Sequence, residues 1–145
     1  MTPELGPDVV GQPGAAVGHD RQHDRGQQQD VDGVLAVIAP DDDVVGIGTG
    51  PDEWRVGPEE FKAQLERDFA QSEALSVDYE PLVVSEAGPV VWVAGRATVQ
   101  ARVEGQGLTL IGRFTAVLEK REGRWLLVQT HFSLPAAQQA EGRSF

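Results

Sequence analysis

The sequence predicts an α+β domain in which long antiparallel strands pack on amphipathic helices. The clearest sign is the run 112–135, which reads as two long strands joined by a tight turn at Glu122 and Gly123. A second sign is the alternation of apolar and polar residues over 90–103 and 108–120, which is typical of strands with one buried face. These patterns indicate a sheet that lays one face on helices.

Capping and turn residues set the order of the remaining elements. Asp30 or Asp32 is expected to cap a short amphipathic helix that Pro40 ends. Pro58 suits the first turn of a second helix, which has an apolar stripe at helical spacing. The predicted elements are, in order, a helix from 31, a strand at 43–49, a turn at 50–52, a helix at 59–72, and strands at 76–85, 90–103, 108–120 and 124–133.

The composition of the chain changes near residue 30. Residues 1–30 are rich in Gly, Pro, Gln, His and Arg and poor in large apolar side chains, so burial there cannot offset the entropy lost on ordering. We therefore expect an irregular or poorly ordered segment at 1–30, a folded domain at 31–135 and a loose C-terminal tail at 136–145.

Charge and composition narrow the classes of partner. Among 145 residues, 12 Lys and Arg stand against 23 Asp and Glu, a net charge of −11 that repels nucleic acids and anionic membranes. The chain has no cysteine, and we expect no metal and no cofactor. With no apolar run long enough to span a bilayer and no secretory signal, a cytoplasmic protein is expected. The preference for Arg over Lys suggests a GC-rich bacterial genome.

The strand alternation separates two faces of the sheet. Odd-numbered residues of 90–103 and even-numbered residues of 108–120 are apolar or small and are expected to face the helices. In the last strand Leu126 and Val128 are assigned to this inner face and Trp125 to the outer one. The outer face is rich in aromatic and arginine side chains, as protein interfaces are. We predict a homodimer through it, with an interface that includes Trp92, Arg96, Arg113, Gln129 and His131.

Several motifs in the chain resemble those of one protein superfamily. They are Val45–Thr49, Trp54 and Gly57 near the start of the domain, and residues 113–115, 123–125 and 131–133 at its end. Through them, residues 31–135 resemble the SnoaL-like branch of the nuclear transport factor 2-like (ketosteroid isomerase-like) superfamily. The last hairpin is also similar to the association domain of calcium/calmodulin-dependent protein kinases.

The resemblance implies a cone-shaped, curved, mixed or antiparallel sheet wrapped around helices, with a pocket between them. Members of the superfamily begin with a long amphipathic helix, which is atypical or missing here. Small inward-facing residues leave volume for a small, mostly apolar ligand, unless aromatic side chains fill it. The expected walls of the pocket are Trp54, Phe61, Phe69, Phe114, Thr130 and Phe132.

Candidates for acid–base chemistry are few. Asp42 or Asp43 could act as a base if the cone desolvated its carboxylate and raised its pKa, although a solvated turn is the simpler interpretation. His131 is a lone imidazole, either catalytic or hydrogen-bonded in an interface. The sequence therefore favours a small-molecule-binding or association domain of unknown ligand. The alternative is an enzyme of isomerase, dehydratase or cyclase type with an Asp or His base in the cone.

Overall fold

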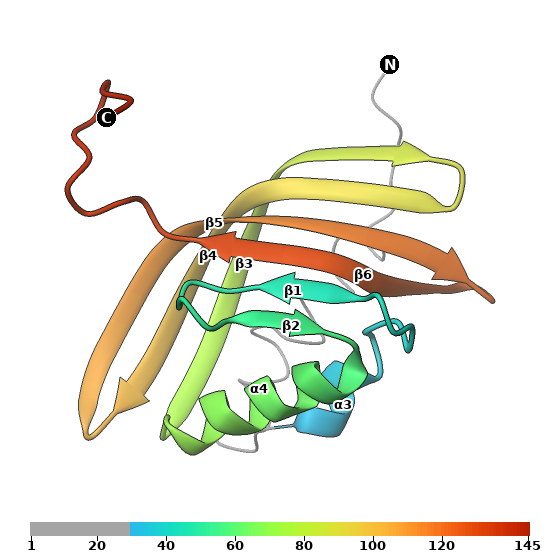
Figure 1. Ribbon diagram of the computed structural model, residues 1–145, viewed down its shortest axis with the longest axis horizontal. Coiled ribbons are helices and arrows are strands. Elements are labelled where there is room, and N and C mark those ends of the chain that lie inside the picture. Colours follow the sequence, from blue (N-terminus) through green and yellow to red (C-terminus); the bar gives the residue numbers. More distant parts are fainter. Residues whose placement is uncertain (1–29) are drawn as a thin grey trace.

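A six-stranded sheet curves over two helices in the computed structural model, which describes residues 30–145 (Figure 1). The elements are α3 (Val31–Leu35), β1 (Val45–Ile47), β2 (Trp54–Val56), α4 (Pro58–Ala70), β3 (Ala74–Ala87), β4 (Val90–Val103), β5 (Gln106–Arg121) and β6 (Arg124–Ser133). The strand order is β2-β1-β6-β5-β4-β3. β1 runs parallel to β6, and every other neighbouring pair is antiparallel.

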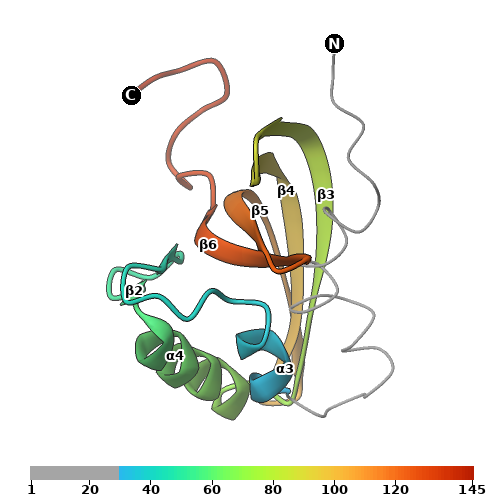
Figure 2. The ribbon, with the colours of Figure 1, turned by 90° about the vertical axis from the view of Figure 1, so that its right-hand side faces the viewer.

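This arrangement confirms the predicted α+β class and the curved, mixed sheet. Figure 2 shows the sheet bending over α3 and α4, which lie on its concave side. Residues 1–29 lie outside the described residues, and with them nearly all of the segment predicted to be irregular and the first helix predicted to be atypical or missing. At the other end, residues 134–145 form no helix or strand.

The start of the described chain shows why α3 is short. Asp30 caps it, because the Asp30 carboxylate accepts a hydrogen bond of 2.9 Å from the Gly33 N–H. The helix ends before the predicted proline stop because the next residues join the sheet. The Ala39 N–H donates to the Leu127 carbonyl, and the Leu127 N–H donates to the Val37 carbonyl, both at 2.8 Å.

The sequence pattern does not predict β2, which is too short for an alternation to be recognised. It pairs with β1 so that Arg55 lies opposite Gly46. Its two other residues, Trp54 and Val56, are exposed on the outer face of the sheet, while Arg55 points to the concave side. A charged side chain therefore enters the cone from an edge strand.

A β-bulge in β6 shifts the register of the last hairpin. Val117 and Leu118 are neighbours on β5, but they pair with Gln129 and Leu127 respectively. Val128 is thus an extra residue on β6, and the direction of the side chains changes at this point.

The bulge makes part of the predicted facing of β6 wrong. In the part of β6 that precedes the bulge, Leu127 is buried and Trp125 packs against the core. The alternation assigns the inner face to Leu126 and Val128 instead. After the bulge, the alternation runs as predicted. A period-2 pattern cannot reveal such a bulge, because the run 125–128 that contains it is apolar throughout.

Helix α4 follows the predicted signals at its start. Gly57 precedes it with a φ of 85°, in the left-handed region that glycine tolerates, and Pro58 occupies its first turn together with Glu59 and Glu60. The two carboxylates lie at the positive end of the helix dipole. The helix buries Phe61 and Phe69, and also Gln64, which its apolar stripe does not predict.

The core lies between the helices and the middle strands. Its completely buried large side chains are Val44, Val91 and Leu118. The inward positions predicted for the middle of β4 and β5 are confirmed, since Val93 and Phe114 are among the buried residues, but Leu108, near the start of β5, is 48% exposed. Neither described helix has the length and hydrophobicity to cross a bilayer. The cytoplasmic location stays a prediction.

Candidate functional site

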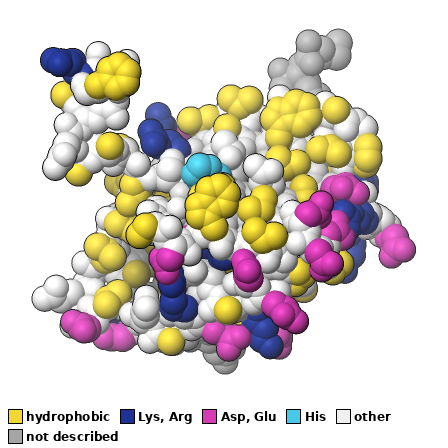
Figure 3. Space-filling view, viewed as in Figure 1, with side chains coloured by type: hydrophobic (Ala, Val, Ile, Leu, Met, Phe, Trp, Pro, Cys, Tyr) yellow, Lys and Arg dark blue, Asp and Glu magenta, His cyan; other side chains and the backbone are white. Residues whose placement is uncertain are grey.

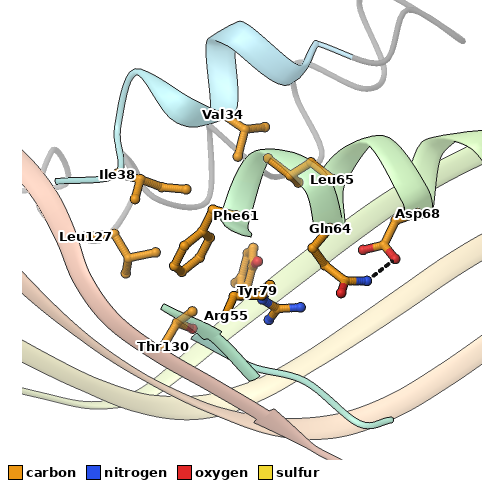
Figure 4. Close-up of a pocket in the computed structure, with 10 residues that line it drawn as sticks. All are labelled: Val34, Ile38, Arg55, Phe61, Gln64, Leu65, Asp68, Tyr79, Leu127 and Thr130. Carbon is orange, nitrogen blue, oxygen red and sulfur yellow. Dashed lines mark hydrogen bonds between the residues drawn. The ribbon is translucent and has the colours of Figure 1, made fainter. Parts of the chain in front are cut away.

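A cavity of about 150 Å³ lies between α4, α3 and the concave face of the sheet (Figure 4). Most of the surface of its wall is apolar, and five of its lining residues carry polar or charged groups. The described residues that line it are Val34, Ile38, Arg55, Phe61, Gln64, Leu65, Asp68, Tyr79, Leu127 and Thr130. An apolar cavity with a few convergent polar groups is the usual form of a small-molecule site.

Arg55 is the unusual member of this wall. Its Nε atom is buried and has no hydrogen-bond partner among the described residues. Its guanidinium carbon lies 5.6 Å from the centre of the Phe61 ring, within the range of a cation–π contact. Desolvation lowers the pKa of Arg55, and the nearby charges of Glu53 and Asp68 offset only part of that effect. The Arg55 side chain thus brings to the cavity a buried donor that the described part of the chain leaves unpaired.

Gly46 makes room for Arg55. It pairs with Arg55 on one side and with Thr130 on the other, so the three residues form one row across the concave face. A Cβ atom at Gly46 would lie 2.6 Å from the Phe61 ring and 3.2 Å from the Arg55 Nε. A side chain at this position is therefore incompatible with the present placement of both groups.

Asp68 brings a carboxylate to the same cavity. One of its oxygens accepts a hydrogen bond of 2.7 Å from the Gln64 amide, drawn in Figure 4. The same amide lies 3.3 Å from a carboxylate oxygen of Glu53. Burial raises the pKa of Asp68, the Gln64 hydrogen bond opposes that rise, and the charge of Glu53 adds to it. Asp68 is therefore easier to protonate than an exposed aspartate.

Two hydroxyl groups complete the polar side of the site. Tyr79 enters from β3, its ring edge-on to Phe114 with 5.0 Å between the ring centres. Burial raises the pKa of Tyr79 to about 12, so its phenol is a neutral donor at physiological pH. Thr130 enters from β6, and its hydroxyl donates to the Thr115 carbonyl at 3.2 Å.

The structure distributes the six predicted ligand-binding residues over different places. Phe61 and Thr130 line the cavity. Phe114 lies behind Tyr79 in the core, Phe132 packs against the core from β6, and Phe69 is buried at the end of α4. Trp54 is 64% exposed and lies on the outer face, because β2 directs Arg55, and not Trp54, into the cone.

None of the predicted acid–base candidates lies in the cavity wall. Asp42 and Asp43 are exposed on the loop before β1. Their neighbour Asp41 makes two hydrogen bonds to Arg121, at 2.9 and 2.6 Å, and these lower the pKa of Asp41. His131 is exposed on the outer face. The acid that the fold does bring inside is Asp68.

The outer face of the sheet carries all five residues predicted for a dimer interface. Arg96 pairs with Arg113, and Trp92 lies in line with Val117 and then Gln129 across β4, β5 and β6. His131, the fifth residue, lies two positions after Gln129 on β6 and so on the same face. Figure 3 shows hydrophobic side chains across the middle of the molecule in the view of Figure 1, with acidic groups along its lower and right-hand margins. Shared location on one face agrees with the prediction, and the dimer itself remains a prediction.

Sequence reasoning missed four polar residues of the cavity, which are Arg55, Gln64, Asp68 and Tyr79. Gln64 and Asp68 follow Phe61 at spacings of three and seven, with Leu65 at four, which is the spacing of one helix face. That spacing was a usable signal for the two residues on α4. Arg55 carried no comparable signal, because its inward direction depends on the pairing of a three-residue strand.

Comparison with known proteins agrees with this architecture. A family model described as a SnoaL-like domain matches residues 19–137. No curated protein matches the chain.

Many solved structures share the fold at low sequence identity. A candidate aromatic ring hydroxylase from Novosphingobium aromaticivorans superposes with a TM-score of 0.76 at 16% identity, covering 92% of this chain and 93% of that one. A nuclear transport factor 2-like protein of unknown function from Shewanella oneidensis has a TM-score of 0.68 at 20% identity, covering 89% and 99%. A ketosteroid isomerase-like protein from Erwinia carotovora has a TM-score of 0.65 at 18% identity, covering 91% of this chain and 99% of that one.

Proposed function

Because this chain belongs to the SnoaL-like domain family, whose model spans most of its length, we propose that it is a small-molecule-binding domain with its ligand site in the cone cavity. The observation that carries the proposal is a cavity with a mostly apolar wall and a buried donor, the Arg55 Nε, that has no hydrogen-bond partner within residues 30–145. Buried polar groups are normally hydrogen-bonded, so an unpaired one beside an empty volume favours an occupant.

The cavity volume sets the size of this ligand. A cavity of about 150 Å³ accommodates a molecule the size of benzene. A neutral probe built on one benzene ring, benzyl alcohol, is expected to bind in the wild-type protein and to shift the amide resonances of residues around the cavity in proton–nitrogen NMR spectra.

A matched pair of variants tests the location of the site. Leu65 lines the cavity from α4, whereas Leu82 is 55% exposed on β3. Leu65→Phe is expected to fill the cavity and abolish binding of benzyl alcohol, and Leu82→Phe to leave it unchanged. Binding that survives Leu65→Phe in a folded protein contradicts the proposed location, and circular dichroism checks the fold of both variants.

A second function, acid–base catalysis, is favoured by Asp68. Burial raises the pKa of this carboxylate, and it shares the cavity with two donors, Arg55 and Tyr79. A base beside donors that stabilise a developing oxyanion is the arrangement needed to move a proton next to a carbonyl group. This deepens the isomerase, dehydratase or cyclase alternative and replaces the bases predicted from the sequence.

Hydrogen–deuterium exchange tests this alternative without a known substrate. The ring of cyclohexanone is close to benzene in size, and exchange at its α-carbon is followed by NMR in deuterated buffer. The wild-type protein is expected to accelerate exchange, and Asp68→Asn to lower that acceleration by about 10²–10⁴-fold. The control is Glu66→Gln, which removes an exposed carboxylate from the same helix. Exchange no faster than in buffer argues against catalysis.

We also propose that the chain forms a homodimer through the outer face of its sheet. Five of the large hydrophobic side chains that remain exposed fall on this face, by strand register and alternation: Trp54, Val56, Val83, Trp92 and Ile111. Contiguous exposed apolar surface is a common mark of a protein interface. In this arrangement the helices, which lie on the concave side of the sheet, stay clear of the partner.

Light scattering after size exclusion tests the dimer. The mass of the wild-type protein is expected to be twice that of the 15.6 kDa chain. Ile111 is 63% exposed on the outer face, so Ile111→Glu should yield the monomer mass, whereas Leu82→Glu, at an exposed site on the edge strand β3, serves as the comparison. A monomeric wild-type protein contradicts the proposal.

A further inference from the structure

Arg55 is the cavity group whose chemistry identifies the ligand most narrowly. Its side chain reaches the cavity from the concave side of β2, over the ring of Phe61. The Nε donor is buried without a partner among the described residues, and no described carboxylate lies within ion-pair distance of the guanidinium. A buried charge that the protein itself leaves unpaired is costly, unless a ligand pairs it.

Glu53 and Asp68 are the acids whose charges act on Arg55, but neither pairs with it, because both are hydrogen-bonded to other groups. Glu53 accepts hydrogen bonds from the Gly50 N–H and the Gln64 amide, and lies 3.6 Å from the guanidinium of Arg67. Asp68 accepts from the same Gln64 amide. The acids therefore lower the local positive potential without supplying the acceptor that Arg55 lacks.

The groups that line the cavity favour a carboxylate over a phosphate as the hydrogen-bond acceptor for Arg55. The guanidinium fork matches the two coplanar oxygens of a carboxylate, and hydrogen bonds between charged partners are about twice as strong as neutral ones. A dianionic phosphate is unsuited to a cavity that Asp68 also lines, since one positive charge cannot balance it. The Tyr79 hydroxyl supplies a second, neutral donor in the same cavity. Apart from Gln64 and Thr130, the rest of the wall is apolar, and the cavity has the volume that a benzene ring requires.

We propose that the ligand is a small monocarboxylate with an apolar body, and that Arg55 binds its carboxylate inside the cone. This inference rests on the proposed ligand-binding function and specifies the chemical class of the ligand. Because the carboxylate of Asp68 lines the same cavity, it repels such a ligand, and its neutralisation strengthens binding.

Benzoate and benzamide form a matched pair of probes, alike in shape and different in charge. Titrations of the full chain are followed by proton–nitrogen NMR, in which the Arg55 Nε–H gives its own resonance, assigned by its loss in Arg55→Met. Benzoate is expected to shift this resonance and to bind at least about tenfold more tightly than benzamide, as for a hydrogen bond between charged partners.

Three variants complete the test. Arg55→Met should weaken benzoate binding about tenfold or more and leave benzamide binding nearly unchanged. Asp68→Asn should strengthen benzoate binding only. Arg143→Gln removes the same charge as Arg55→Met from the exposed C-terminal tail, and should change neither.

The outcomes separate this inference from the function on which it rests. If benzyl alcohol and benzamide bind but benzoate binds no better and leaves the Arg55 Nε–H resonance unmoved, the carboxylate inference is wrong while the binding function holds. If none of the three probes binds in the millimolar range, both are wrong. If Arg55→Met does not fold, the affinities of the wild-type protein for benzoate and benzamide still decide the matter, because equal affinities contradict the carboxylate inference.

Discussion

Replacing Arg55 by methionine is expected to leave the ligand-free protein as stable as before, or more stable, although the residue is largely buried. Methionine keeps the length and much of the volume of the side chain and removes its charge and its donors. In most proteins the loss of a buried arginine destabilises, because a partner is left behind. Here the described part of the chain, residues 30–145, gives the Arg55 Nε no partner to leave behind.

The magnitude follows from the contacts of Arg55. Removing an unsatisfied buried donor recovers about 1–3 kcal/mol. The cation–π contact with Phe61, at 5.6 Å, is worth about 0.5–1 kcal/mol, and a sulfur–aromatic contact of about 0.3–1.5 kcal/mol replaces part of it. Attraction to Glu53 and Asp68 is lost too, but it is smaller than the desolvation that lowers the Arg55 pKa. The net expectation is a gain of about 0–2 kcal/mol in the free energy of unfolding.

Urea unfolding at neutral pH and equal protein concentration measures this difference. The midpoint of unfolding should stay or rise at an unchanged slope. The matched control is Arg121→Met, which removes an arginine that is hydrogen-bonded to Asp41 and Glu119 and should lower the midpoint. A loss of more than about 1 kcal/mol in Arg55→Met would refute the reasoning, because it would show that the charge of Arg55 is paired in the folded protein.

Three further predictions concern the fold around the site. Leu118→Ala should cost about 2–5 kcal/mol in urea unfolding, since the side chain is 1% exposed, whereas Leu108→Ala on the same strand, 48% exposed, should cost under about 1 kcal/mol; equal losses would contradict the assigned core. Gly46→Ala should destabilise by about 1–3 kcal/mol and displace the side chains that face it, detectable as a shift of the arginine Nε–H resonance in the cavity; an unchanged spectrum would contradict the close packing. The pKa of Asp41 is lowered by Arg121, so this pair stabilises the protein above the ordinary aspartate pKa of 3.8 and the effect disappears as the pH falls through the lowered value. Asp41→Asn should therefore lower the melting temperature near neutral pH and make it less sensitive to acid, and parallel pH profiles of the two proteins would contradict this.

The elements with the strongest sequence signals were the ones predicted correctly. Alternation over β4 and β5 lasts for a dozen residues or more, long enough for burial on one face to dominate the pattern, and Val91, Val93 and Phe114 are buried as expected. The proline and the two acids at the start of α4 mark its first turn for a local reason, the open N–H groups and dipole of the helix.

The failures have equally definite causes. The bulge at Val128 lies in the apolar run from 125 to 128, in which odd-numbered and even-numbered residues are equally hydrophobic. Only the pairing with β5 therefore decides which side chains turn inward. The predicted bases Asp42 and Asp43 failed because a carboxylate becomes a base through its surroundings, and theirs is solvent. Asp68 reads as an ordinary polar helix residue, and only its spacing from Phe61 points to the buried face.

By itself, the sequence determined the fold class, the order of its main elements and the two faces of the central strands, because these depend on the spacing of side chains along the chain. It also determined that the domain is acidic and has no cysteine chemistry. The tertiary structure alone decided where the functional groups meet. Arg55, Gln64, Asp68 and Tyr79 come from β2, α4 and β3, and their common cavity exists only once the sheet has curved over the helices. Desolvation, which makes these groups unusual, depends on that enclosure and not on any local pattern.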